Sequence, residues 1–69
     1  MKQSFTITEE LNGVEKTLIA EIDLENIEQA KGFAEAYRVY ALSTLNVKND
    51  DGTTLASKVF EWFAPTPKQ

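Results

Sequence analysis

Carboxylates are the side chains of this sequence best able to carry chemistry, because histidine and cysteine are both absent. The run Asp50-Asp51-Gly52 has the composition of a calcium-binding loop. However, placing Gly52 at the glycine position of an EF-hand loop puts Val47 and Lys58 at ligand positions, and neither side chain binds calcium. Aspartate and glycine are also the residues that a tight turn needs. The run therefore predicts a turn, and we expect no metal site and no cofactor.

Neighbouring acidic residues could instead act as a general acid and a general base. Glu9 and Glu10 are adjacent, but adjacent residues of a strand point to opposite faces of a sheet. Histidine, the commonest general base, is missing, and a chain of 69 residues has little room for a substrate pocket. The sequence therefore predicts no catalytic residues, no small-molecule substrate and a protein that is not an enzyme.

Acidic residues are concentrated in the first half of the chain. The net charge is −4, and residues 1–35 contain eight acids and three lysines, against three acids and four basic residues in 36–69. A chain with this charge and no basic cluster is a poor ligand for nucleic acid, so we expect no direct nucleic-acid binding. The acidic surface could bind a basic partner, although mild acidity commonly serves solubility alone. Its predicted residues are Glu10, Glu15, Glu21, Glu25 and Glu28.

The run Val59-Phe60-Glu61-Trp62-Phe63 is the segment most suggestive of binding. In a strand these residues alternate between two faces, and a single helix covers only one face of a sheet. Val59 and Phe63 are expected to face the helix. Phe60 and Trp62 would then lie on the open face, unless the proline-containing end of the chain covers them or the faces are inverted and both belong to the core. The predicted partner-binding patch contains Ile19, Leu42, Phe60 and Trp62.

A helix and two hairpins must position these side chains. Apolar residues recur at helical spacing only between Leu24 and Ala41, where the stripe is wide enough to cover a sheet. Asp23 is the predicted N-cap, with Asn26 as the alternative. The helix is expected to end between Tyr37 and Ala41. The stripe consists of Ile27, Ala30, Phe33, Ala34, Tyr37, Tyr40 and Ala41.

The first hairpin is predicted from two alternating segments, Ser4 to Leu11 and Val14 to Ile22, on either side of Asn12-Gly13. Asn-Gly is the strongest short hairpin signal, because both residues tolerate the positive φ of a type I′ turn. The charged pair nearest the turn is expected to reach water. The pairs that this turn predicts on one face are Leu11 with Val14, Glu9 with Lys16, Ile7 with Leu18 and Phe5 with Ala20.

The second hairpin is predicted from Leu42 to Lys48 and Thr54 to Phe63, joined across Asp50-Asp51-Gly52. A three-residue loop with Gly52 in the left-handed region is the preferred connection. Its pairs are Val47 with Leu55, Ser43 with Val59 and Leu42 with Phe60. A two-residue loop is the alternative, and its pairs are Leu45 with Lys58 and Lys48 with Leu55.

The sequence thus predicts one small α+β domain over residues 1–64, in which two β-hairpins flank one helix and a four-stranded sheet carries the helix on one face. Residues 65–69 contain both prolines of the chain and are predicted to form a flexible tail. The order of the elements resembles that of small immunoglobulin-binding domains and β-grasp proteins. This resemblance of layout implies that the first and last strands lie side by side and parallel at the centre of the sheet. The alternative is a simple antiparallel order.

No apolar run approaches the length of a membrane span, and no signal-peptide pattern is present, so we expect a cytoplasmic protein that does not bind membranes. The expected function is that of a small acidic protein-interaction module. It would bind a protein partner, or a second copy as a homodimer, through the aromatic sheet face. The alternative is an acidic decoy, a phage-type or regulatory inhibitor that occupies a basic nucleic-acid-binding site of another protein.

Overall fold

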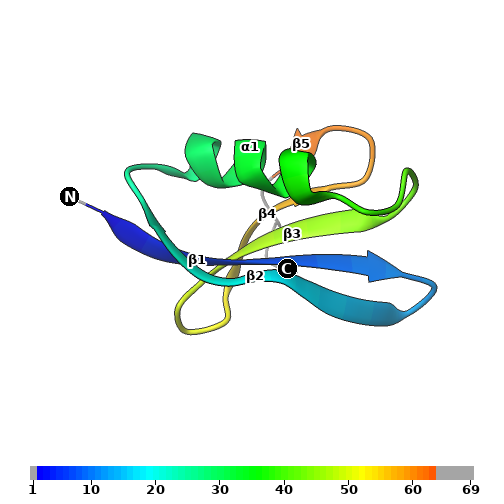
Figure 1. The fold of residues 1–69 in the computed structure, drawn as a ribbon, viewed down its shortest axis with the longest axis horizontal. Helices are drawn as coiled ribbons and strands as arrows, with labels where there is room; N and C mark the ends of the chain where they lie inside the picture. Colours follow the sequence, from blue (N-terminus) through cyan, green and yellow to red (C-terminus); the bar gives the residue numbers. More distant parts are fainter. Residues whose placement is uncertain (1, 64–69) are drawn as a thin grey trace, which may run out of the picture.

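The computed structural model describes residues 2–63, which form one helix and five strands. The strands join in a single sheet in the order β2-β1-β3-β4-β5, and each pair of neighbours is antiparallel. The helix lies along one face of this sheet (Figure 1). The elements are β1 (Gln3–Leu11), β2 (Val14–Leu24), α1 (Ile27–Tyr37), β3 (Thr44–Asn49), β4 (Thr54–Lys58) and β5 (Trp62–Phe63).

The predicted α+β class is confirmed, with one helix against an antiparallel sheet, but the sheet has five strands rather than four. The additional strand arises because the predicted last strand, Thr54 to Phe63, is interrupted by a turn at residues 59–61. The chain reverses there, and β5 returns antiparallel along β4. The predicted tail at residues 65–69 lies outside the described residues.

The strand order differs from the order implied by the β-grasp resemblance. β1 pairs with β3 in the antiparallel sense, so the predicted parallel pair at the centre is wrong and the simple antiparallel alternative holds. Burial explains why β3 takes the central place, since its Leu45 and Val47 are fully buried. β4 ends at Lys58, whose charge is easier to accommodate towards an edge of the sheet.

The first hairpin has the predicted turn, in which the φ values of Asn12 and Gly13 are 55° and 80°. Near this turn the register is also the predicted one. Two irregularities then displace β2, so the predicted partners of Ile7 and Phe5 are wrong. The observed pairs are Ile7 with Ile19 and Phe5 with Ile22, in place of Ile7 with Leu18 and Phe5 with Ala20. The displacement brings two large side chains against the core, and the small Ala20 remains exposed.

The second hairpin turns where predicted, at Asp50 to Gly52, but its preferred register is wrong. Asn49 explains the difference, because its Oδ1 atom accepts hydrogen bonds from the backbone N–H groups of Asp51 at 3.2 Å and Thr53 at 2.9 Å. This loop extends to Thr53 and shifts β4 along β3. The observed pairs are Leu45 with Lys58, Val47 with Ala56 and Lys48 with Thr54, so the two-residue alternative was right at Leu45 and wrong at Lys48.

Helix α1 spans Ile27–Tyr37, so it begins later than predicted and ends within the predicted interval. Asn26 is the N-cap, and its Oδ1 accepts a hydrogen bond from the backbone N–H of Gln29 at 3.1 Å. The side chain of Gln29 accepts in return from the backbone N–H of Glu25 at 2.8 Å. The first choice of cap, Asp23, is wrong because it belongs to β2.

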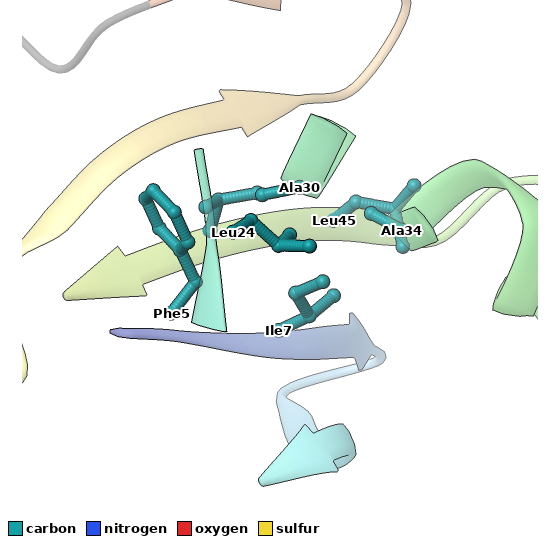
Figure 2. Packing of buried hydrophobic residues seen from close by; sticks show 7 residues of the cluster. Phe5, Ile7, Leu24, Ala30, Ala34 and Leu45 are labelled. Carbon is teal, nitrogen blue, oxygen red and sulfur yellow. The ribbon is translucent and has the colours of Figure 1, made fainter. Parts of the chain in front are cut away.

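The core lies between α1 and the centre of the sheet (Figure 2). Ala30 and Ala34 are the fully buried residues of the helix, and their small side chains allow it to approach the sheet closely. They cluster with Phe5, which is among the largest fully buried side chains of the described residues. The remaining members of the buried cluster are Ile7, Leu24, Leu45 and Val47.

Candidate interaction surfaces

Trp62 lies on the helix side of the sheet, so its predicted place on the open face is wrong. It pairs with Lys58 across β4 and β5, and it is half-buried against the core cluster. The indole Nε1 donates a hydrogen bond to Glu35 of α1 at 2.8 Å. The ammonium groups of Lys31 and Lys58 lie 5.7 and 5.9 Å from the ring centroid, within cation–π range.

These four residues, Trp62, Glu35, Lys58 and Lys31, form what we call the Trp62 clasp. Lys58 completes it with an ion pair to Glu35 at 3.0 Å. Hydrogen bonds from Trp62 and Lys58 lower the pKa of Glu35 and outweigh the effect of its partial burial. The clasp therefore joins the short strand β5 to the helix through an ionised carboxylate.

The predicted partner-binding patch is divided between two places. Ile19 packs against the core, as Trp62 does. Phe60 lies in the turn between β4 and β5, and Leu42 lies in the turn before β3; both are strongly exposed. The division follows from the interrupted last strand, because the alternation that should place Phe60 and Trp62 on one face does not continue through a turn.

The open face of the sheet is polar over β1 to β4. At its edge, exposed Phe63 of β5 pairs with Ser57 and so lies on this face, and the expectation that Phe63 faces the helix is wrong. Thr8 on β1 donates a hydrogen bond from Oγ1 to Glu15 on β2 at 2.8 Å, and the same carboxylate pairs with Lys48 on β3 at 3.0 Å. Ser57 on β4 donates to Asn46 on β3 at 2.6 Å. These contacts connect side chains across four neighbouring strands. Hydrogen bonds from Thr8 and Lys48 lower the pKa of Glu15, so this carboxylate is ionised at neutral pH.

Four carboxylates line the open face of the β1–β2 hairpin, and we call this surface the acidic face. Glu10 is directly opposite Glu15 in the register. Further along, Ser4 pairs with Asp23 and donates a hydrogen bond to Glu21 at 3.3 Å. Among the side chains that β1, β2 and β3 present on this face, Lys48 is the basic one. The acidic face, which consists of Glu10, Glu15, Glu21 and Asp23, therefore carries a clear excess of negative charge.

The other two residues of the predicted acidic surface lie beside the helix start. Glu25 precedes the N-cap, and Glu28 in the first turn pairs with Lys31 at 3.1 Å. Asp23 belongs to the acidic face but was missed there, because its sequence position favoured a helix cap. The predicted acidic surface is thus divided at the junction between β2 and α1.

Glu9 is a buried carboxylate on the core side of β1, with only 2% of its surface exposed. It accepts hydrogen bonds from the backbone N–H groups of Tyr40 at 2.9 Å and Val39 at 3.2 Å, and from the hydroxyl of Ser43. Burial alone would raise the pKa of Glu9, but the hydrogen bonds from Ser43, Tyr40 and Val39 and the nearby Arg38 guanidinium outweigh it and lower the pKa.

Arg38 holds the same loop from the other side. Its guanidinium donates to the backbone carbonyls of Tyr40 at 2.8 Å and Ser43 at 2.7 Å. Glu9 pairs with Lys16 as predicted, but the expectation that its charge reaches water is wrong. Strand alternation did indicate that Glu9 is buried, since it places Glu9 on the same face as Ile7. The residues that bind its carboxylate lie about 30 positions away and cannot be found from local sequence.

Exposed apolar side chains gather at the end of the molecule that contains this loop, and we call this surface the apolar end. Tyr40 lies near the tip of the β1–β2 hairpin, where it lines a hollow of about 130 Å³ with Leu11 and Val14. The loop over residues 38–43 and the turn between β4 and β5 are at the same end (Figure 1). The members of the apolar end are Val14, Val39, Tyr40, Leu42 and Phe60.

Within residues 2–63, no group of three or more histidine, cysteine, aspartate or glutamate side chains could hold a metal ion. The same part of the chain contains no helix that is long and apolar enough to cross a membrane. The candidate sites of this small α+β protein are therefore two surfaces, one acidic and one apolar.

No family model and no curated protein matches the sequence. Among solved structures, AcrIF9 is similar, with a TM-score of 0.78 over 100% of this chain and 93% of the AcrIF9 chain. The two sequences are 20% identical. At this identity the likeness shows a common fold.

Proposed function

We propose that this chain is a small acidic inhibitor, not an enzyme, that binds a protein and occupies its basic nucleic-acid-binding site. The acidic face is the observation that carries the proposal, because four carboxylates lie on one face of a hairpin, where Lys48 pairs with Glu15 and Lys2 lines a hollow with Asp23. The fold adds support, because the similar structure AcrIF9 is an anti-CRISPR protein, and an inhibitor of that kind would act on a Cas complex. A Cas complex binds nucleic acid, so a decoy for that site requires negative charge.

The physical basis of the proposal is charge complementarity. A groove that binds nucleic acid is lined with lysine and arginine, and rows of carboxylates can replace the phosphates that these side chains contact. On the acidic face, Glu15 and Glu21 are already held by hydrogen bonds from Thr8 and Ser4. Less side-chain freedom is then lost when the partner binds.

This proposal keeps the broader expectation of a protein-interaction module and favours the decoy over the aromatic sheet face. The open face is polar over β1 to β4, and Trp62 lies on its other side. At the edge of the open face Phe63 of β5, which pairs with Ser57, is exposed, so this face offers one aromatic ring rather than the predicted aromatic patch.

The test measures binding to a purified, guide-loaded Cas complex. We expect affinity to fall when salt rises from about 50 mM to about 200 mM, because exposed ion pairs are screened. Replacing three carboxylates of the acidic face together, with Glu10→Gln, Glu21→Gln and Asp23→Asn, should weaken binding roughly tenfold and reduce the salt dependence. Glu28→Gln is the matched control, because Glu28 lies beside the helix start.

A decoy also predicts competition. Saturating amounts of the chain should prevent the complex from binding its target DNA, and the triple variant should need about tenfold more protein for the same effect. Binding that is independent of salt, or that leaves target DNA bound, would contradict the proposal.

A further inference from the structure

The two most exposed large apolar side chains of the described residues lie in two turns at one end of the sheet. Phe60 is 88% exposed and Leu42 is 83% exposed. Val39 and Tyr40 are exposed beside Leu42, and Val14 is exposed at the tip of the β1–β2 hairpin. A chain of this size rarely leaves several large apolar side chains together in water without a use for them.

The sheet register brings these side chains to the same edge. Thr44 at the start of β3 pairs with Glu10, near the tip of the first hairpin. Leu45, the next residue, pairs with Lys58 at the end of β4. The segment that leads into β3, which contains Leu42, and the segment that follows β4, which contains Phe60, therefore lie at the end of the sheet that also contains the hairpin tip (Figure 1).

Both turns are fixed by polar contacts beneath them. Glu9 and Arg38 hold the loop that carries Leu42 through hydrogen bonds to its backbone. The Trp62 clasp holds β5 to the helix and so fixes the far side of the turn that carries Phe60. Apolar side chains presented on ordered turns lose little freedom when they are buried in an interface, which is the property of a binding hot spot.

The negative charge of this chain indicates which kind of partner suits the apolar end. Glu10 of the acidic face borders the loop through its pairing with Thr44, and Glu61 follows Phe60 directly. Lys16 lines the hollow that Tyr40 and Val14 share. A second copy of the chain, with its net charge of −4, would bring like charges together at this border. A partner whose apolar pocket is bordered by lysine or arginine would gain from the same arrangement.

We infer that the apolar end is the anchor of the interface whose electrostatic part is the acidic face. Leu42 and Phe60 enter an apolar pocket that lies beside the basic site of the same protein partner. The inference rests on the proposed function, and it adds that affinity depends on two apolar side chains as well as on charge.

The test uses the same guide-loaded Cas complex and two single variants, Leu42→Ser and Phe60→Ser. Each should weaken binding roughly tenfold or more, mainly through faster dissociation, at low and at high salt alike. The melting temperature should not change, because both side chains are exposed. Phe33→Ser is the matched control, since Phe33 is exposed on the helix beside Gly32 and Ala36, in a separate hollow.

Each outcome is decisive. If both variants bind as the wild type does while the triple acidic variant is weakened, the inference is overturned and the proposed function stands. If the wild type does not bind the complex, both are overturned. Light scattering over a range of concentration tests whether a second copy of the chain binds the apolar end. A dimer that dissociates in the Leu42→Ser and Phe60→Ser variants would assign the apolar end to self-association and overturn the inference.

Discussion

Glu9 shows how one buried carboxylate can determine the course of a loop. Its oxygens accept from two consecutive backbone N–H groups, those of Val39 and Tyr40, which follow the end of α1. Backbone N–H groups left without an acceptor beside this buried carboxylate would cost free energy. The charge of Glu9 therefore binds the backbone and does not reach solvent. The same residue therefore fixes the loop that presents Leu42.

Replacing Glu9 tests this role directly. Glu9→Gln should lower the free energy of unfolding by about 1–2 kcal/mol, because an uncharged amide replaces a charged acceptor and places its NH₂ group near backbone donors. Urea denaturation measures the loss. Glu10→Gln is the control, since Glu10 is exposed on the opposite face, and its effect should stay within about 0.5 kcal/mol. Equal effects of the two variants would contradict the role of Glu9.

The lowered pKa values of Glu9, Glu15 and Glu35 predict acid sensitivity. A carboxylate with a lower pKa in the folded state stabilises the fold above its unfolded pKa of about 4.3. This stabilisation is lost as pH falls below about 4.3 and through the lower folded value. Stability measured by circular dichroism should therefore be level from neutral pH down to about 5 and decline below it. Glu9→Gln should make that decline shallower, and an unchanged decline would exclude Glu9 as a source.

At the scale of elements, β5 depends on contacts with the helix. It has only two residues and pairs with the end of β4, so the sheet alone offers it few hydrogen bonds. The Trp62 clasp supplies the other attachment, from β5 to Glu35 of α1. Because Trp62 is the single tryptophan of the chain, its fluorescence reports on this attachment alone.

Glu35→Ala should release Trp62 from the helix. We expect a red shift of its emission and faster quenching by iodide, because the indole N–H loses its acceptor and Lys58 loses its ion pair. The cost in stability should be no more than about 1 kcal/mol, since these contacts are partly exposed. Glu21→Ala, on the acidic face, should leave the emission unchanged. Emission that stays the same in Glu35→Ala would show that packing alone holds the ring.

The elements differ in how far the sequence determined them. The Asn12-Gly13 turn, the end of α1 and the loop at Asp50 to Gly52 follow from local chemistry, and these predictions are confirmed. The register of the second hairpin was missed although it depends on the local hydrogen bonds of Asn49, whereas the strand order and β5 were missed because distant contacts decide them. The turn at 59–61 leads β5 to the clasp with Glu35, which no pattern within the strand reveals.

The candidate surfaces divide in the same way. Glu10, Glu15 and Glu21 share one face because strand alternation and the hairpin register place them there. The apolar end could be predicted only in part. Leu42 and Phe60 were expected in one patch, and the β3–β4 pairing places their two segments at one end of the sheet. The tip of the β1–β2 hairpin joins that end through the non-local pairing of β1 with β3, which local sequence does not reveal.

At the scale of the whole molecule, the core is small, and one side chain can decide whether the chain folds. Cores of this size supply only about 3–5 kcal/mol. Phe5→Ala removes a fully buried aromatic ring at a cost of about 3–5 kcal/mol, so we expect a largely unfolded variant by circular dichroism. Phe60→Ala removes the same ring from an exposed turn and should retain wild-type stability within about 0.5 kcal/mol. A folded Phe5→Ala variant would show that stability comes from elsewhere.

The pairing of β1 with β3 also has a consequence for the rate of folding. The other strand pairs join neighbours in the chain, whereas this one brings Phe5 to Asn49 and Glu10 to Thr44 across the whole helix. Closing so long a loop is slow, while hairpins form within microseconds. The rate-limiting step should therefore be the meeting of two preformed hairpins. Substitutions that weaken the pairing of β1 with β3 should slow folding. Substitutions that remove the attachment of β5 to the helix should mainly speed unfolding.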